Sequence, residues 1–174
     1  MSLLSPADLV EYKKHPVYAY SALKNESWIS ELSKNIILYH HERQDGSGYP
    51  LKTLKITTEM GIVHVCDTFD EMICGLGCEK VKVYEAINYL RQHKGTKFDA
   101  KIVDEFLQFA AVYPAGTMVY TSEGETAIVI RQNKECPDRP VIRILKDRLG
   151  NNVTTDISKD LVELTAIHIE KVID

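Results

Sequence analysis

The sequence predicts a mainly α protein whose helices give way to a small β-rich segment. Two observations carry this prediction. Over roughly the first 112 positions, apolar residues recur at the spacing of amphipathic helices. From Tyr113 onward, short runs rich in β-branched residues alternate with turn residues, as β-strands do. We therefore expect two parts, residues 1–112 and residues 113–174.

The chain opens with helices that carry clear start and break signals. Ser5-Pro6-Ala7-Asp8 combines a hydroxyl N-cap, a proline at the first helical position and an early acid, which favours a helix start. His15-Pro16 interrupts this helix, because proline lacks an amide donor and restricts the residue before it. A second helical piece runs through Leu23. The apolar spacing from Trp28 predicts a third helix that carries the chain to His40-His41.

Three more helices complete the first part. Residues 43–57 are expected to form a loop, after which Thr57 or Thr58 caps a long apolar helix that ends at Gly75 and Gly77. Two amphipathic helices follow, at residues 79–92 and 99–111. The β-rich part is expected to hold strands at residues 118–120, 127–130, 141–145 and 167–173.

Composition excludes several classes of protein. Residues 1–113 carry 13 basic and 15 acidic side chains and residues 114–174 carry 8 and 10, so each part has a charge of −2 and neither is a basic nucleic-acid-binding module. The sequence has no apolar run near the roughly 18 residues of a transmembrane helix and no signal peptide. The four cysteines lack a common zinc-binding spacing, and we expect reduced thiols. Together these features favour a cytoplasmic protein.

The segment that carries chemistry is His-His-Glu-Arg-Gln-Asp-Gly-Ser-Gly-Tyr-Pro at residues 40–50. Neighbours on a helix point about 100° apart. We therefore expect the two histidines to serve two metals, or one metal and one substrate group, better than they chelate one ion. His15 lies at the helix break, and Asp67 is a carboxylate in an otherwise apolar helix, where it is costly unless paired or metal-bound. Imidazole and carboxylate are ligand types that Mn, Fe or Zn accept.

Each feature also has an ordinary structural explanation. A histidine before proline, such as His15, is commonly structural or exposed, and so is a His-His pair. Asp67 by itself fits a helix cap or an ion-pair partner, and a turn rich in Asp and Gly occurs in many folds. His64 lies one turn before Asp67 among apolar neighbours, so we expect it to be packed or hydrogen-bonded, not bound to a metal.

The order and spacing of these segments resemble the HD-GYP domains. The similar segments are Lys14-His15-Pro16, residues 40–50, Asp67-Thr68-Phe69-Asp70, and Phe98-Asp99 before an apolar helix. The resemblance covers about residues 5–111, and the later residues resemble a small β-extension found on some family members. It implies an HD-domain-like helical bundle followed by a small β-rich C-terminal subdomain.

The resemblance implies a metal-dependent phosphodiesterase that hydrolyses cyclic di-GMP in bacterial signalling. By this mapping the metal ligands are His15, His40, His41 and Asp67. The implied ion is Fe, Mn or Zn, which would activate a hydroxide for attack on a phosphodiester and neutralise the developing charge.

Other residues of the loop are implied to support this centre. Glu42 and Asp45 would orient the ligands. Gly48, Tyr49 and Pro50 would shape the guanine-nucleotide pocket or a face that meets diguanylate cyclase domains.

Two departures from the family pattern bear on activity. The family's His-Asp pair precedes the Lys-His-Pro segment, whereas residues 1–14 contain no histidine and Asp8 as the sole aspartate. The family's basic Arg-Pro-Tyr-Arg type segment after Asp70 is replaced by residues without a cation before Lys80. We therefore expect an incomplete or degenerate centre that holds at most one metal ion, partially or not at all, and little or no activity from this chain alone.

Three alternatives stay open. A homodimer or a separate chain would supply the missing ligands. A non-catalytic signalling module would keep the Gly-Tyr-Pro loop as a docking surface. A different HD-type phosphohydrolase would act on another phosphate ester.

Overall fold

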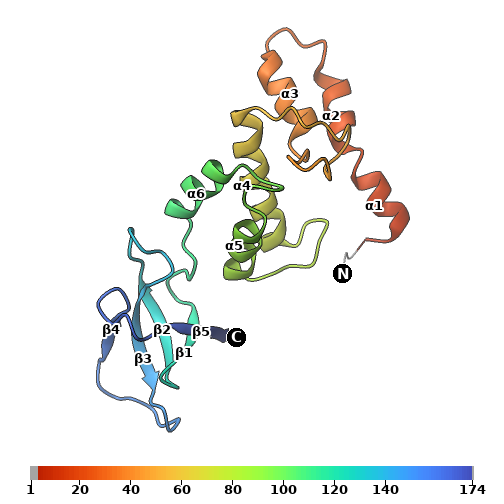
Figure 1. Cartoon of the computed structure of the whole chain (residues 1–174). Coiled ribbons are helices and arrows are strands. Elements are labelled where there is room, and N and C mark those ends of the chain that lie inside the picture. The colour runs from red at the N-terminus through yellow and green to blue at the C-terminus, as the bar shows by residue number, and fades with distance from the viewer. Residues whose placement is uncertain (1–3, 174) are drawn as a thin grey trace. The chain divides into compact units, whose positions relative to one another are not determined.

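The structure is a computed structural model that describes residues 4–173. It divides into two compact units, residues 1–106 and 107–174, the first helical and the second built on one sheet (Figure 1). The coarse prediction of a helical part followed by a β-rich part is therefore confirmed.

Consecutive helices pack on one another in the first unit. α2 contacts α3, α3 contacts α4, and α4 contacts α5 (Figure 1). The helices of the described residues are α1 (Pro6–Tyr12), α2 (His15–Leu23), α3 (Glu31–Tyr39), α4 (Thr58–Cys74), α5 (Val83–Gln92) and α6 (Ala100–Phe109). Within residues 4–173, no helix combines the length and the apolar character that crossing a bilayer requires.

Several predicted helix ends are confirmed. The Ser5 hydroxyl accepts a hydrogen bond from the amide of Asp8 at the start of α1. Thr57 caps α4. Gly75 ends α4 in the left-handed region, with φ 78°, where a side chain would be strained.

The predicted bounds of α3 are wrong at both ends. The helix begins at Glu31 and not at Trp28, because the Ser30 hydroxyl accepts a hydrogen bond from the amide of Ser33 at 3.0 Å and caps the first turn there. It ends at Tyr39, so His40 is its C-cap and His41 lies beyond it. The prediction that two helical neighbours point away from each other therefore does not apply.

The second unit is a five-stranded antiparallel sheet in the order β4-β3-β2-β1-β5. Its strands are β1 (Met118–Thr121), β2 (Thr126–Arg131), β3 (Val141–Lys146), β4 (Ser158–Asp160) and β5 (Ile169–Ile173). β4 was not predicted, because its three residues, Ser-Lys-Asp, have no apolar alternation. The core of the sheet includes Val119, Ala127, Val129, Ile142 and Ile144.

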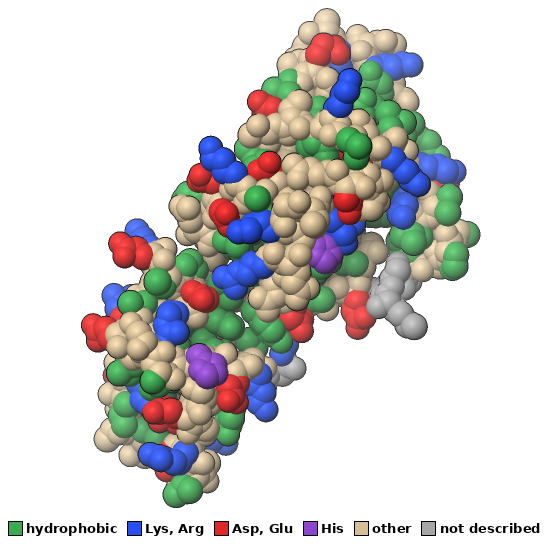
Figure 2. Space-filling view, in the orientation of Figure 1, with side chains coloured by type: hydrophobic (Ala, Val, Ile, Leu, Met, Phe, Trp, Pro, Cys, Tyr) green, Lys and Arg blue, Asp and Glu red, His purple; other side chains and the backbone are tan. Residues whose placement is uncertain are grey.

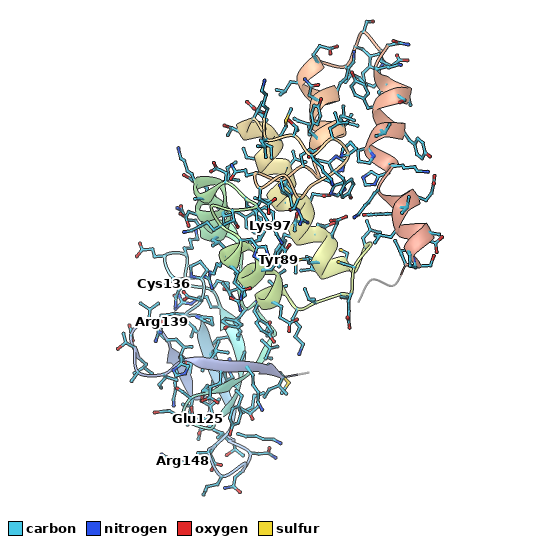
Figure 3. All side chains as sticks on the ribbon, turned by 45° about the vertical axis from the view of Figure 1, so that its right-hand side comes forward. Tyr89, Lys97, Glu125, Cys136, Arg139 and Arg148 are labelled. Atoms are coloured by element: carbon cyan, nitrogen blue, oxygen red, sulfur yellow. The ribbon has the colours of Figure 1, made fainter. Side chains whose placement is uncertain are left out.

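The charged side chain of Arg139 in the second unit has structural partners. The Arg139 guanidinium, labelled in Figure 3, donates to the backbone carbonyls of Leu161 at 2.6 Å and Ile167 at 2.8 Å. On the visible face of each unit, basic and acidic side chains are interspersed (Figure 2), in keeping with the balanced charge of the sequence.

Candidate metal centre

The start of α2 and the end of α3 bring three histidines together. His15 is the first residue of α2, His40 is the C-cap of α3, and His41 follows it. The ring centroids of His15 and His40 lie 5.3 Å apart, those of His15 and His41 4.9 Å, and those of His40 and His41 4.1 Å. One nitrogen from each ring lies within 4.8 Å of the other two. The adjacent histidines therefore converge on one place, contrary to the prediction of two separate roles.

The tautomers of two of these rings follow from their backbone contacts. His15 Nδ1 lies 2.8 Å from the Tyr12 carbonyl oxygen, and His40 Nδ1 lies 2.8 Å from the Ile37 carbonyl oxygen. A carbonyl only accepts, so both Nδ1 atoms carry a proton, and in the neutral form of each ring the Nε2 atom carries a lone pair. These two Nε2 atoms lie 3.2 Å apart. Two lone pairs repel each other at this distance, so either a proton on one Nε2 atom or a metal ion between the two rings fits this arrangement.

The contacts of His41 also fit a cation bound among the three rings. Only 6% of it is exposed, and burial, with the neighbouring His40 and His15 rings, lowers its pKa to about 2, so it is neutral. Its Nε2 lies 3.2 Å from His15 Nε2, and its Nδ1 lies 3.4 Å from Asp67 Oδ2. A neutral ring has one N–H, so a lone pair faces either the His15 lone pair or the carboxylate. When His15 is neutral, either tautomer of His41 leaves one repulsive contact, which a bound cation would relieve.

Two carboxylates on α4 lie beside His41. Asp67 Oδ2 is buried and makes no hydrogen bond, which is uncommon for a buried carboxylate oxygen. Glu71 lies one turn further along α4, and the Tyr12 hydroxyl donates to its Oε1 at 2.5 Å. Burial raises the pKa of both carboxyl groups. One nitrogen of His41 and one oxygen each from Asp67 and Glu71 lie within 4.8 Å of one another.

Glu71 and Tyr12 were missed in the sequence. The signal was present for Glu71, because residues four apart on a helix share a face and Asp67 was already a candidate. No comparable signal exists for Tyr12, since its partner lies 59 positions away.

Glu42 holds the loop that follows the histidines. Its side chain is fully buried, and its carboxylate accepts hydrogen bonds from the amides of Leu51 at 2.6 Å and Thr53 at 3.0 Å. Asp45 is exposed and accepts from the Ser47 amide at 2.9 Å. Both residues were expected to orient metal ligands, whereas these hydrogen bonds shape the loop.

The Gly-Tyr-Pro part of the loop packs directly on His41. A Cβ at Gly48 would lie 2.5 Å from the His41 carbonyl oxygen and from Glu42 Cα, so glycine is required there. The Tyr49 ring stacks on the His41 ring, with centroids 4.6 Å apart and planes 23° apart. Pro50 follows Tyr49 through a cis peptide bond. The loop therefore confines His41 on one side.

A pocket of about 250 Å³ adjoins Glu71. Its lining includes Arg43, Glu71 and Tyr89. Arg43 was not proposed from the sequence, which named only lysines after Asp70 as cations. The guanidinium supplies a positive charge next to the candidate metal ligands.

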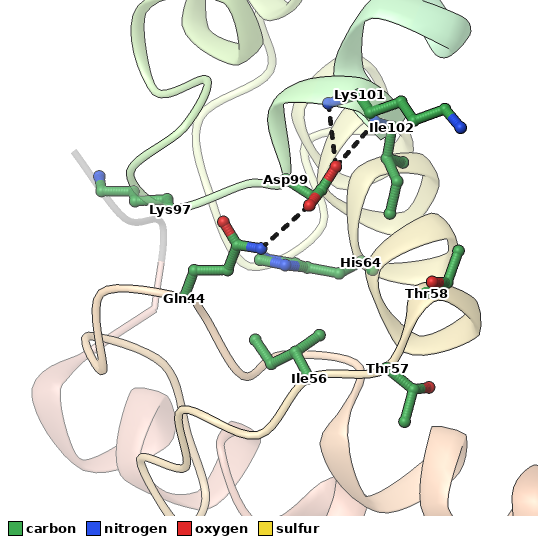
Figure 4. A pocket seen from close by; sticks show the side chains of 10 residues that line it. Gln44, Ile56, Thr57, Thr58, His64, Lys97, Asp99, Lys101 and Ile102 are labelled. Carbon is green, nitrogen blue, oxygen red and sulfur yellow. Dashed lines mark hydrogen bonds between the residues drawn. The ribbon is translucent and has the colours of Figure 1, made fainter.

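A second pocket, of about 270 Å³, lies around His64 (Figure 4). Its polar wall includes Asp99, whose carboxylate accepts from the amides of Lys101 and Ile102 and from the Gln44 side chain. His64 itself is 3% exposed and packs on Phe98, with ring centroids 4.7 Å apart. Burial lowers its pKa to about 4. His64 is packed as the sequence predicts.

Comparisons with known proteins identify the family of each part of the chain. Residues 2–102 match the family described as HD domain, and residues 118–174 match the KOW domain associated with HD domain. The chain is similar to a cyclic di-GMP phosphodiesterase of Pseudomonas aeruginosa, PA4108, at 27% identity over 76% of this chain and 32% of that protein. It is also similar to the cyclic di-GMP phosphodiesterase response regulator RpfG of Xanthomonas campestris, at 35% identity over 61% of this chain and 30% of the relative.

A solved structure shares the fold. It is Bd1817, an HDG"Y"P protein from Bdellovibrio bacteriovorus, with a TM-score of 0.51 and 23% identity over 61% of this chain and 35% of that chain. The chain spans about a third of the length of the curated relatives it matches. Since the HD domain match covers more than half of the sequence, the chain belongs to the HD domain family, and its similarity to cyclic di-GMP phosphodiesterases and to an HDG"Y"P protein supports a domain of the HD-GYP type.

Proposed function

We propose that residues 1–112 form the metal-binding part of a phosphodiesterase that acts on cyclic di-GMP in bacterial cytoplasmic signalling, and that residues 113–174 form a small β subdomain. The observation that carries the proposal is the approach of His15 Nε2 and His40 Nε2 to 3.2 Å while both Nδ1 atoms face carbonyl oxygens. A metal ion between the rings would accept both Nε2 lone pairs of the neutral imidazoles. The similarity to cyclic di-GMP phosphodiesterases supplies the nucleotide.

The proposed ligands are His15, His40, His41 and Asp67, and the proposed ion is Fe, Mn or Zn. All three imidazoles are partly or fully buried, and neutral imidazole is the form that binds these metals. When bound, the ion would supply Lewis acidity and an activated water for phosphodiester hydrolysis. Asp67 adds a negative charge that compensates the ion.

Arg43 is proposed to meet a phosphate of the nucleotide. Its guanidinium lines the pocket that Glu71 also lines, so the pocket adjoins the metal site. A planar guanidinium makes paired hydrogen bonds to phosphate oxygens. Tyr49, stacked on His41, lies at the same centre and offers a ring for a guanine base. The Gly-Tyr-Pro loop thus supports both metal and substrate contacts.

The experiment is a metal titration of the 174-residue chain with Mn²⁺, Zn²⁺ and Fe²⁺, followed by titration with cyclic di-GMP. His40→Ala should weaken metal binding at least about tenfold, since it removes a ligand. His168→Ala, an exposed histidine of the second unit, is the matched control and should bind as the unaltered chain does. Equal metal affinity in the His40→Ala variant and the control would refute the proposed site.

One observation favours the alternative of an interaction module. Leu51 and Leu54, which follow the Gly-Tyr-Pro loop, are 61% and 69% exposed. Exposed apolar side chains beside a rigid loop suit protein docking. Under this alternative, a Leu51→Ser and Leu54→Ser double variant loses binding to a diguanylate cyclase domain while metal affinity is unchanged. Retained binding to that domain would exclude these two leucines as the docking surface.

A further inference from the structure

The pocket around His64 contains none of the proposed metal ligands (Figure 4). Its volume is about 270 Å³. This is below the roughly 300–1,000 Å³ of pockets that enclose drug-sized ligands, so it suits one ring system better than a whole cyclic dinucleotide. Ile56 and Ile102, both half-buried, contribute apolar side chains to its lining. The lining therefore favours a small ligand with an apolar ring face.

His64 is the residue of this pocket that points to a ligand. Only 3% of its surface is exposed, and within residues 4–173 its ring makes no hydrogen bond. A buried polar side chain without a partner is uncommon. Burial lowers its pKa to about 4, so the ring is neutral, with one nitrogen that donates and one that accepts. Because His64 lines the pocket, a bound molecule would supply the missing partner.

Asp99 and Gln44 add hydrogen-bond acceptors to the wall of the pocket. Asp99 Oδ1 accepts from the amides of Lys101 at 2.9 Å and Ile102 at 3.1 Å, at the start of α6. The contact of Asp99 Oδ2 with Gln44 Nε2 is long, at 3.4 Å, so this carboxylate oxygen can still accept from a ligand. The same contact leaves Gln44 Oε1 as a further acceptor. The pocket therefore offers two oxygens to a ligand that carries N–H groups.

The charges around the pocket favour an uncharged ligand. A small anion would meet the Asp99 carboxylate, and the Lys97 ammonium is engaged with Tyr89, to whose hydroxyl it donates at 3.2 Å. The Lys97 and Lys101 side chains both point away from the His64 ring in Figure 4. A cation such as a guanidinium would match Asp99 but has no acceptor for the N–H of His64. A neutral molecule with adjacent N–H groups and a separate acceptor fits all of these side chains.

We propose that this pocket binds a guanine base, whose N1–H and N2–H groups donate to Asp99 and Gln44 and whose acceptors face His64. Guanine carries the two donors side by side and has O6 and N7 as acceptors. Neutral adenine and cytosine lack a ring N–H beside an exocyclic amino group. The site goes beyond the proposed metal-dependent function, because it uses none of the proposed metal ligands. The base would belong to a guanosine nucleotide, or to a cyclic di-GMP whose second half lies outside the pocket.

The test is a nuclear magnetic resonance titration of the 174-residue chain with guanosine, without added metal ions. Guanosine has no phosphate, so the proposed metal site and Arg43 do not attract it by charge. It should shift the signals of the Gln44 side-chain amide and the Ile102 methyl groups in a saturable way. Inosine, which lacks the exocyclic amino group, should bind about tenfold more weakly. Titrations with guanosine monophosphate and with cyclic di-GMP distinguish the two sources of the base.

Two variants test the polar groups of the pocket. Asp99→Asn keeps an oxygen for the amides of α6 but places an N–H group where the ligand needs an acceptor, so guanosine should bind at least about tenfold more weakly. His64→Leu removes both ring nitrogens and should weaken guanosine binding to a similar extent. Glu105→Gln, an exposed acid of α6, is the control and should bind guanosine as the unaltered chain does.

Several results would overturn the guanine site. Equal guanosine affinity in Asp99→Asn and the control, or equal affinity for guanosine and inosine, contradicts the proposed contacts. Shifts that do not saturate mean that the pocket holds water only. Shifts at Tyr49 without shifts at Gln44 place the base at the metal centre, which removes this site and leaves the proposed function intact. Conversely, the metal titration of His40→Ala can fail while guanosine still binds beside His64.

Discussion

Replacing Glu42 with glutamine tests how the loop before the proposed pocket is held. The Glu42 carboxylate is fully buried and accepts from the amides of Leu51 and Thr53, at 2.6 and 3.0 Å. Glutamine has the same shape but offers one carbonyl oxygen and one amide group. It therefore keeps one acceptor and points N–H groups at the second backbone donor.

The expected loss of stability follows from these two hydrogen bonds of Glu42. One buried backbone amide loses its acceptor, which costs about 1–3 kcal/mol, and the remaining bond changes from charge-assisted to neutral, which costs about 1 kcal/mol more. Removing a buried charge acts in the opposite direction, because the charged form is poorly solvated there. We expect a net destabilisation of the helical unit of about 2 kcal/mol.

The assay is urea unfolding followed by circular dichroism at the helical signal, together with hydrogen exchange of the Leu51 and Thr53 amides. Exchange of these two amides should accelerate more than that of amides inside α4. Glu105→Gln, an exposed acid of α6, is the control and should change stability by less than about 0.5 kcal/mol. A Glu42→Gln variant as stable as the control, with unchanged exchange at both amides, would refute this account of the loop.

Other outcomes are expected. Burial lowers the pKa of His64 from 6.5 to about 4 in the folded chain. As the pH falls, the His64 ring of the unfolded chain is therefore protonated at a higher pH than that of the folded chain, so the free energy of unfolding falls between about pH 6.5 and pH 4. From about pH 7.5 to about pH 5 the part of the loss that is due to His64 is about 2 kcal/mol, so the pH dependence measured by urea unfolding should be smaller by this amount in a His64→Leu variant. Gly48→Ala should cost at least about 1–3 kcal/mol, since its Cβ meets backbone atoms at 2.5 Å, and thermal unfolding checks this. Removing residues 114–174 should leave metal affinity unchanged in a titration, and loss of binding would count against separate roles for the two parts. Cyclic di-GMP hydrolysis by the 174-residue chain, followed by chromatography, should be negligible, and robust turnover that disappears in His41→Ala would contradict this.

The local features of the fold were readable in the sequence because their causes are local. Ser5 and Thr57 cap helices through their own hydroxyls, and Gly75 ends α4 because it adopts a left-handed conformation. Apolar periodicity located the long helix that carries Asp67. The sequence-based prediction was wrong at the start of α3, where the Ser30 hydroxyl caps the helix. It also missed β4, which is too short and too polar to show an apolar alternation.

The sequence by itself determined the family motifs, the helical-then-β order and the residue types of a metal site. Only the tertiary structure decided that these side chains converge on one place, as metal ligands must. Because α3 stops at Tyr39, His40 and His41 turn toward His15 instead of diverging along a helix. Glu71 became a candidate only when Tyr12, distant in sequence, was seen to hold it beside Asp67. Spacing along a chain reports which residues share a face, whereas the direction of a ring nitrogen or a carboxylate oxygen depends on contacts from other elements.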